Sequence, residues 1–263
     1  MAPEEEALIS HPIEYSWHAP TRTRSQYCFE WLGRLFGLCV VAVISVWVFV
    51  FLGGVGLSPL ATDPGVNDTS PIFNWHPLLM SVAVPIFLSE AVVSYRTWGT
   101  TGFGPAEPRP RRKALHVSLH AAAVVLMSAA VLAAVKSHTM KLPAPIPNLY
   151  SAHSWLGVTA LSMLGLQAFV GAWAYLFPGW SWDARRGLAP WHGFLGRATY
   201  TAALAAMATG LQEKASLLQL GAGAAVRGPL LLLPAVAVVL LALTGGTYLS
   251  QHIFARQAGT GRE

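Results

Sequence analysis

Long stretches of apolar residues, several of them 18 residues or longer, constrain the fold of this chain more than any other feature of its sequence. A helix of about 20 apolar residues crosses the hydrocarbon core of a bilayer. Apolar residues make up 54% of the 263 residues, and charged residues make up 11%. The sequence therefore predicts an all-α integral membrane protein, a six-transmembrane-helix bundle in a lipid bilayer. The expected spans are residues 31–57, 75–98, 114–135, 150–177, 191–211 and 228–250.

The distribution of Lys and Arg predicts the orientation of the chain. Of 17 such residues, twelve fall on one side of the expected spans, four on the other, and Arg197 lies inside the fifth span. Cations accumulate on the cytosolic side of membrane proteins, so we expect both termini in the cytosol. The chain then consists of a cytosolic tail (1–30), a transmembrane domain (31–250) and a second cytosolic tail (251–263). The pI near 9.5 follows from this sorting and does not indicate a nucleic-acid partner.

Four histidines, His76, His116, His153 and His192, lie at or near the starts of four successive spans. They are 40, 37 and 39 residues apart, which is about one membrane crossing plus a loop. Successive crossings reverse direction, so His76 and His153 share one membrane face, and the other two share the opposite face. A pair of facing neutral imidazoles is a natural set of axial ligands for a haem iron. The spacing therefore favours a two-haem electron conduit across the membrane.

Other interpretations of these histidines remain open at this point. His120 lies one helical turn deeper than His116 on the same face, so either residue is a candidate ligand, and the two together can bind a metal ion. The histidines can also line a metal-ion or proton pathway. A third interpretation is a two-haem protein that senses redox state without turning over an acceptor. Any of these functions is compatible with ionisable side chains at membrane depth, which are rare and usually functional.

Further residues near the histidines fit a flat anionic cofactor. Glycine follows His153 and His192 by four residues, at Gly157 and Gly196, and leaves room on the same helix face for a macrocycle. Arg197 is then placed to pair with a propionate. The cationic run at 111–113 precedes His116 and suits either propionates or an anionic electron donor, although a role in setting topology alone is the alternative.

Two polar residues in or near the spans also call for an explanation. Glu90 lies fourteen residues below His76 in the second span, about 21 Å along the axis. A carboxylate at that depth has to be neutral, paired or hydrated. Asn67 opens the sequon Asn-Asp-Thr in the first outer loop, so it is a candidate glycan acceptor close to the membrane.

Five short motifs resemble the cytochrome b561 family. They are Phe-Asn-x-His-Pro at 73–77, Tyr-Arg at 95–96, Lys-x-x-His at 113–116, Tyr-Ser-x-His-Ser-Trp-x-Gly at 150–157 and Trp-His-x-x-x-Gly at 191–196. They cover spans two to five in the family order. The resemblance implies an ascorbate-dependent transmembrane oxidoreductase in which helices 2–5 enclose two haems b. Such a protein passes electrons from cytosolic ascorbate to monodehydroascorbate or a ferric chelate on the other side.

The resemblance also implies roles for single residues. The outer haem iron would have His76 and His153 as axial ligands, and the cytosolic haem iron His116 and His192, with the Lys-x-x-His motif selecting His116 over His120. The candidate substrate residues are, for cytosolic ascorbate, Lys113 and Arg185 with Arg112 and Arg186 as near alternatives, and, on the outer side, His138 and more weakly Tyr150. The outer loop is longer here and contains three prolines, which leaves that assignment open. Family members reside in endomembranes (vesicle, vacuole or lysosome) or the plasma membrane, and homodimers are frequent among them.

Overall fold

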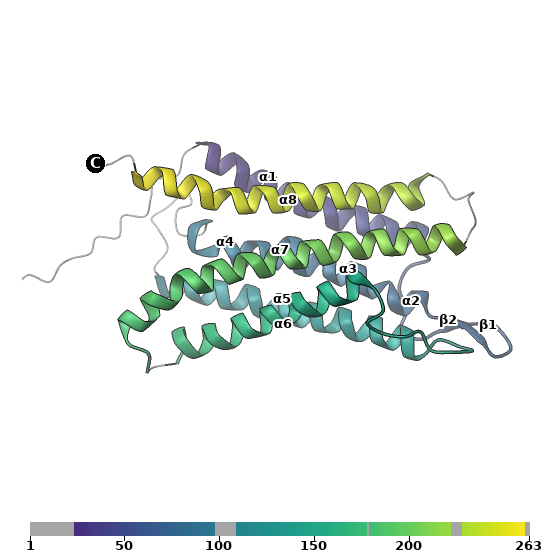
Figure 1. Ribbon diagram of the computed structural model, residues 1–263. Coiled ribbons are helices and arrows are strands. Elements are labelled where there is room, and N and C mark those ends of the chain that lie inside the picture. Colours follow the sequence, from purple (N-terminus) through teal and green to yellow (C-terminus); the bar gives the residue numbers. More distant parts are fainter. Residues whose placement is uncertain (1–23, 98–108, 178, 222–227, 261–263) are drawn as a thin grey trace, which may run out of the picture.

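In the computed structural model, which describes residues 24–97, 109–177, 179–221 and 228–260, the chain is a bundle of long helices with one small hairpin (Figure 1). In chain order the elements are α1 (Arg24–Val46), the π-helix η1 (Trp47–Phe51), β1 (Leu60–Asp63), β2 (Val66–Asp68), α2 (Ser70–Phe73), α3 (Trp75–Val82), the π-helix η2 (Ala83–Leu88), α4 (Ser89–Thr97), α5 (Arg109–Thr139), α6 (Ala152–Tyr175), α7 (Trp182–Gly221) and α8 (Pro229–Thr260). The predicted all-α membrane bundle is confirmed.

Five helical segments are long and apolar enough to cross a membrane. They are Tyr27–Phe51, Ser70–Tyr95, Pro110–Thr139, Ala152–Tyr175 and Pro229–Gln251. The sixth long helix is α7, whose 40 residues extend about 60 Å. Its middle is less hydrophobic than the other spans because Arg197 and several Thr and Gly residues lie there. All six expected spans are therefore helical, and α7 is the most polar of them.

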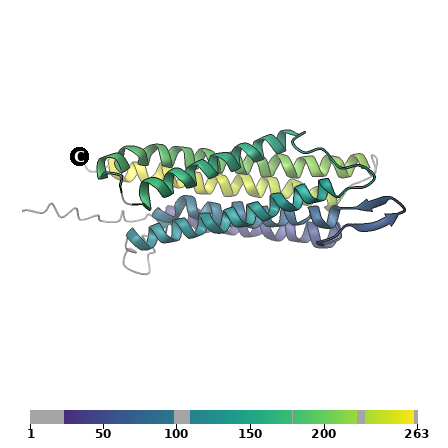
Figure 2. The ribbon, with the colours of Figure 1, turned by 90° about the horizontal axis from the view of Figure 1, so that it is seen from below.

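The helices run side by side and pack in pairs. Helix α1 packs along α8, α6 packs along α7, and α3, η2 and α4 pack along α5. The β1–β2 hairpin projects from one end of the bundle, where α5 also connects to α6 (Figure 2). We call this end the hairpin end. The opposite end, called the basic end, holds the starts of α5 and α7, which carry Arg111, Arg112, Lys113, Arg185 and Arg186.

Helix α7 starts nine residues before the expected span and ends ten residues after it. The Ser181 hydroxyl accepts a hydrogen bond from the Ala184 amide at 3.2 Å, and Asp183 lies in the first turn, so the start is capped in two ways. Pro190 lies inside this helix. Hydrophobicity alone misses the extension, because a capped polar turn outside the membrane needs no apolar residues.

Buried polar contacts connect the outer helices to the rest of the bundle. Arg34 of α1 donates to both carboxylate oxygens of Glu90, at 2.8 and 3.0 Å, and also pairs with Glu30 at 2.8 Å. The Tyr248 hydroxyl of α8 donates to Glu90 Oε1 at 2.6 Å. Glu90 is thus a paired carboxylate, which is one of the three states that its depth allows. These contacts hold α1, α4 and α8 together.

Asn67 holds the hairpin against the connection between α5 and α6. Its Nδ2 donates to the Met140 carbonyl at 2.8 Å, and its Oδ1 accepts from the Leu142 amide at 2.9 Å. The Lys141 ammonium donates to the Asn67 carbonyl. The residue is 8% exposed. The side chain that the sequence marks as a glycan acceptor is therefore engaged in the fold.

Candidate functional site: two histidine pairs in the bundle

At the hairpin end, the first turns of α3 and α6 each carry a histidine that turns into the bundle. The rings of His76 and His153 face each other with centroids 5.8 Å apart and planes at 82°. Two helix starts meet here because α3 and α6 both run away from this end (Figure 1). The sequence prediction that these two residues share a face is confirmed.

At the basic end, a second pair is formed by His116 of α5 and His192 of α7. Their ring centroids are 6.3 Å apart with planes at 63°. Neither residue lies at its helix start, because α5 and α7 extend two to three turns beyond the pair. The basic residues that precede each histidine in sequence lie on these extra turns.

The separation within each pair suits one metal ion bound between two imidazoles. An imidazole nitrogen binds a metal at about 2 Å, so two rings on opposite sides of one ion have centroids roughly 6 Å apart. The observed separations are 5.8 and 6.3 Å. Both pairs therefore fit a metal with two axial histidines, as in a low-spin haem.

Three of the four imidazoles are fixed in the tautomer that a metal ligand needs. In each, Nδ1 lies within hydrogen-bond distance of a backbone carbonyl, which accepts and never donates, so Nδ1 carries the proton. The unprotonated Nε2 is then available to a metal, and such second contacts orient ligating histidines in general. The carbonyls are those of Ala130 for His76 (3.1 Å), Ala91 for His116 (2.9 Å) and Ala206 for His153 (2.7 Å). The buried Nδ1 of His192 has no partner among the described residues.

Glycines on the facing helix give two of the histidines their space. A β-carbon at Gly210 of α7 would lie 2.7 Å from Cε1 and Nδ1 of His153, and one at Gly171 of α6 would lie 3.0 Å from Cε1 of His192. The sequence did not point to these two glycines, and the room that it predicts for the macrocycle itself is at Gly157 and Gly196. A β-carbon on either of those would meet nothing within 4 Å, so both leave open space, and Gly157 lines the cavity described next.

A cavity of about 570 Å³ opens between α3, α5, α6 and α7 at the hairpin end. His76 and His153 both line it, and its deeper walls are apolar, with Met80, Met127 and Leu161 among them. Its volume is within the range of small-molecule and cofactor sites. A flat, mostly apolar group with an iron between the two imidazoles fits this donor set and this lining.

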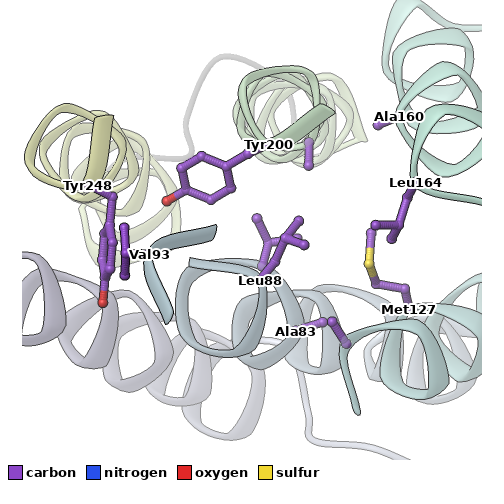
Figure 3. Close-up of a cluster of buried hydrophobic side chains, with 11 residues drawn as sticks. Ala83, Leu88, Val93, Met127, Ala160, Leu164, Tyr200 and Tyr248 are labelled. Atoms are coloured by element: carbon purple, nitrogen blue, oxygen red, sulfur yellow. The ribbon is translucent and has the colours of Figure 1, made fainter. Parts of the chain in front are cut away.

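An apolar core separates the two histidine pairs. Met127 of α5 and Leu164 of α6 point toward each other there, and Leu88 and Tyr200 fill the space beside them (Figure 3). His116 and Ala130, whose carbonyl contacts His76, are fourteen residues apart on α5, so the pairs lie about 21 Å apart along the bundle. Two separate sites, one near each end, follow from this packing.

The metal-transport interpretation receives less support from the side chains. His120 lies beside His116, with ring centroids 4.5 Å apart. Within the described ranges, no group of three or more His, Cys, Asp or Glu side chains is arranged to hold a metal ion. His116 has a carbonyl partner on Nδ1 and faces His192, which favours it over His120 as a ligand.

Two of the predicted ascorbate residues contact Tyr175, next to His192. The Tyr175 ring lies 5.7 Å from the His192 ring. Lys113 donates to the Tyr175 carbonyl, and the Tyr175 hydroxyl donates to the Arg185 carbonyl at 3.0 Å. Arg185 lies two helical turns before His192 on the same face of α7. The Lys113 ammonium and the Arg185 backbone thus both contact Tyr175 beside the basic-end pair, although they come from different helices.

The remaining predicted cations differ in their surroundings. Arg112 donates to the Tyr95 carbonyl at 3.1 Å, and the Tyr95 ring lies 5.3 Å from the His116 ring. The buried Nε atoms of Arg112 and Arg185 have no hydrogen-bond partner within the part of the chain that the structure describes. Arg186 instead lies over the exposed Trp182 ring, with Cζ 5.1 Å from its centroid.

Arg197 extends back along α7 toward Gly193, since a β-carbon on that glycine would be 3.5 Å from Arg197 Nη1.

The predicted outer substrate residues both line the hairpin-end cavity. His138 Nδ1 lies 2.9 Å from Asn148 Oδ1, and Tyr150 is 55% exposed. Partial burial, together with the nearby Glu213 carboxylate, raises the pKa of Tyr150, so its phenol stays neutral at physiological pH. Sequence reasoning missed Asp68, Glu213 and Lys214, which also line this cavity, because their spacing in sequence gives no signal.

Comparison with known proteins identifies a group of similar chains. A family model described as eukaryotic cytochrome b561 matches residues 75–218. Transmembrane ascorbate ferrireductase 1 of Arabidopsis thaliana is 37% identical over 184 residues, which is 70% of this chain and 71% of that protein. Transmembrane ascorbate ferrireductase 2 of the same plant is 34% identical over 71% of this chain and 74% of its own length. The lysosomal membrane ascorbate-dependent ferrireductase CYB561A3 of Homo sapiens is 33% identical over 70% of this chain and 69% of its own.

Proposed function

The chain belongs to the eukaryotic cytochrome b561 family, and from this membership we propose that it transfers electrons across a membrane from ascorbate, through two b-type haems, to an acceptor on the other side. It is an oxidoreductase of the ascorbate-dependent transmembrane type, and haem b is the cofactor of its family.

The observation that carries the proposal is the presence of a suitably spaced histidine pair near each end of one bundle. His76 and His153 would hold one haem iron, and His116 and His192 the other. When bound, each iron supplies reversible one-electron oxidation and reduction. The chain's own residues orient the ligands through backbone carbonyls and exclude water with the apolar core between the pairs.

The cations of the basic end support an ascorbate site there. Ascorbate is an anion at neutral pH, and the unsatisfied guanidinium nitrogens of Arg112 and Arg185 offer charge-assisted hydrogen bonds. Lys113 adds a third positive charge beside Tyr175. The excess of cations at this end supports an orientation in which it faces the cytosol together with both termini.

The hairpin end would then deliver the electron. His138 and Tyr150, at the cavity that His76 and His153 line, are candidates to contact monodehydroascorbate or a ferric chelate. The names of the plant and human relatives support the ferric chelate. The name of the human relative also supports a lysosomal membrane, with vesicle, vacuole and plasma membrane as the other candidate locations.

The proposal is tested first by an optical spectrum of the purified protein with haem quantified per chain. We expect two low-spin haems b, both reduced by ascorbate. Liposomes that contain the protein, with ascorbate inside and a membrane-impermeant ferric chelate outside, should then reduce the chelate. A content of one haem per chain would contradict the proposal that each histidine pair binds a haem. Two reducible haems without reduction of the chelate would indicate a redox sensor instead.

A further inference from the structure

Lys214 lies near the end of α7 and lines the cavity that His76 and His153 also line. Its Nζ is 4.9 Å from the centroid of the Phe73 ring. The Phe73 ring is in turn 5.8 Å from the His76 ring. The ammonium therefore lies one aromatic ring away from a proposed haem ligand, inside the same cavity.

No acceptor in the described part of the chain satisfies this ammonium. Lys214 makes no ion pair or hydrogen bond with any described residue and rests on the face of Phe73. Asp68 is the nearby carboxylate and attracts both Lys214 and Lys141, but it makes no ion pair or hydrogen bond with Lys214 and accepts the Ser70 amide at 2.9 Å. Glu213, the neighbour of Lys214 in sequence, accepts the Ser151 hydroxyl at 2.9 Å. A half-buried ammonium with no hydrogen-bonded acceptor is costly, and an anionic ligand would offset that cost.

The other cation of the cavity is already engaged. Lys141 donates to the Asn67 carbonyl and helps to hold the hairpin. Lys136, a third lysine at this end, is exposed, donates to the Leu57 carbonyl at 2.9 Å and does not line the cavity. Among the described lysines of the hairpin end, Lys214 is thus the one that lines the cavity and has no hydrogen-bonded acceptor.

We propose that Lys214 binds a carboxylate inside the hairpin-end cavity and fixes its position next to His76. This inference rests on the proposed function, because the carboxylate comes either from a propionate of the haem held by His76 and His153 or from an anionic electron acceptor. An ammonium–carboxylate contact in a cavity with apolar walls is a charge-assisted hydrogen bond, which is stronger than the same contact in water. If the carboxylate is a haem propionate, the contact would also favour reduction of that haem, since it neutralises a negative charge that stabilises the more positive oxidised iron.

The test compares Lys214→Gln with Lys214→Arg and with Lys136→Gln as the matched loss of a lysine outside the cavity. Each holoprotein is titrated potentiometrically without substrate, and its haem content is measured. If the carboxylate belongs to a propionate, Lys214→Gln lowers the midpoint potential of one haem, and Lys214→Arg restores it. A tenfold loss in the equilibrium constant for reduction corresponds to 59 mV for one electron. Lys136→Gln should leave both potentials unchanged.

If the carboxylate belongs to a soluble acceptor, the potentials stay the same in all variants. The KM for ferric citrate then rises about tenfold in Lys214→Gln, and an uncharged acceptor such as a quinone analogue is unaffected.

The inference is overturned if the wild-type protein holds two haems and Lys214→Gln does not differ from Lys136→Gln, either in the midpoint potentials of the haems or in the KM for ferric citrate. A wild-type protein without haem would instead refute the proposed function, so the two failures are distinguishable. Loss of haem in Lys214→Gln but not in Lys214→Arg also supports a propionate contact, because arginine keeps the charge.

Discussion

Gly210 of α7 lies directly against the imidazole of His153 of α6, where no side chain fits between the two helices. The same relationship recurs at the other end, where Gly171 of α6 lies against His192 of α7. In each helix the glycine follows the histidine by 18 residues, which is five full helical turns, so both lie on one face. Because α6 and α7 pack along each other in opposite directions, the histidine of each meets the glycine of the other.

The first prediction concerns Gly210→Ala. A β-carbon 2.7 Å from the His153 ring forces the imidazole or the helix to move, so the hairpin-end haem should be lost first. Haem per chain should fall from about two toward one, and the spectrum should keep the signature of the remaining haem. Gly165→Ala on α6 is the control, since its β-carbon would meet nothing within 4 Å. Full haem content in Gly210→Ala would show that His153 has room to shift.

The second prediction separates the two neighbouring histidines of α5. His116→Ala should lose the basic-end haem, because His116 faces His192 and has its Nδ1 fixed by the Ala91 carbonyl. His120→Ala should keep both haems. Haem quantification and the low-spin bands of the two variants check this assignment. The reverse outcome, with haem lost only in His120→Ala, would exchange the two residues as ligands.

The sequence was sufficient to predict the helical spans and the end of the bundle at which each histidine lies. The apolar runs predicted the spans, and the alternation of crossings predicted that His76 meets His153. The start of α7 was missed because it depends on the Ser181 cap and polar residues, which hydrophobicity does not register. Lys214 gives no signal in the sequence, because only the arrangement of α3, α6 and α7 in space places this lysine at a cavity. The 18-residue spacing from histidine to glycine is present in the sequences of both α6 and α7. Its role becomes clear only from the antiparallel packing of the two helices, which places the glycine of each against the histidine of the other.

The third prediction concerns ascorbate. Arg185→Ala should raise the KM for ascorbate roughly tenfold or more, since a hydrogen bond to a charged group contributes about 1.5–3 kcal/mol. Both haems should remain bound, because the contact of Arg185 with Tyr175 uses its backbone carbonyl. Lys113→Ala should act in the same direction. Arg186→Ala is the matched control, because that side chain lies over Trp182 at the surface. Loss of haem in Arg185→Ala would show a structural role instead.

The fourth prediction is a pH dependence at the hairpin end. Burial alone would raise the pKa of Asp68, but the hydrogen bond from the Ser70 amide and the nearby Lys141 and Lys214 lower it below the ordinary value of 3.8. A lowered folded-state pKa means that the ionised carboxylate stabilises the fold above the unfolded value, and that this is lost as pH falls through the folded value. Asp68→Asn should therefore reduce the Tm by a constant amount between pH 5 and 7. The difference should shrink below about pH 4. A difference that already disappears at pH 5 would contradict the lowered pKa.

The last prediction concerns the contact between α1 and α4. Glu90→Gln removes a carboxylate that accepts two hydrogen bonds from Arg34 and one from Tyr248. Breaking a buried ion pair from one side costs about 3–5 kcal/mol, and we expect the lower end of that range because Arg34 keeps Glu30 as a partner. The histidines belong to α3, α5, α6 and α7, so both haems should stay bound while the Tm falls. Haem loss in Glu90→Gln at temperatures where the protein stays folded would instead link this network to the cofactor sites.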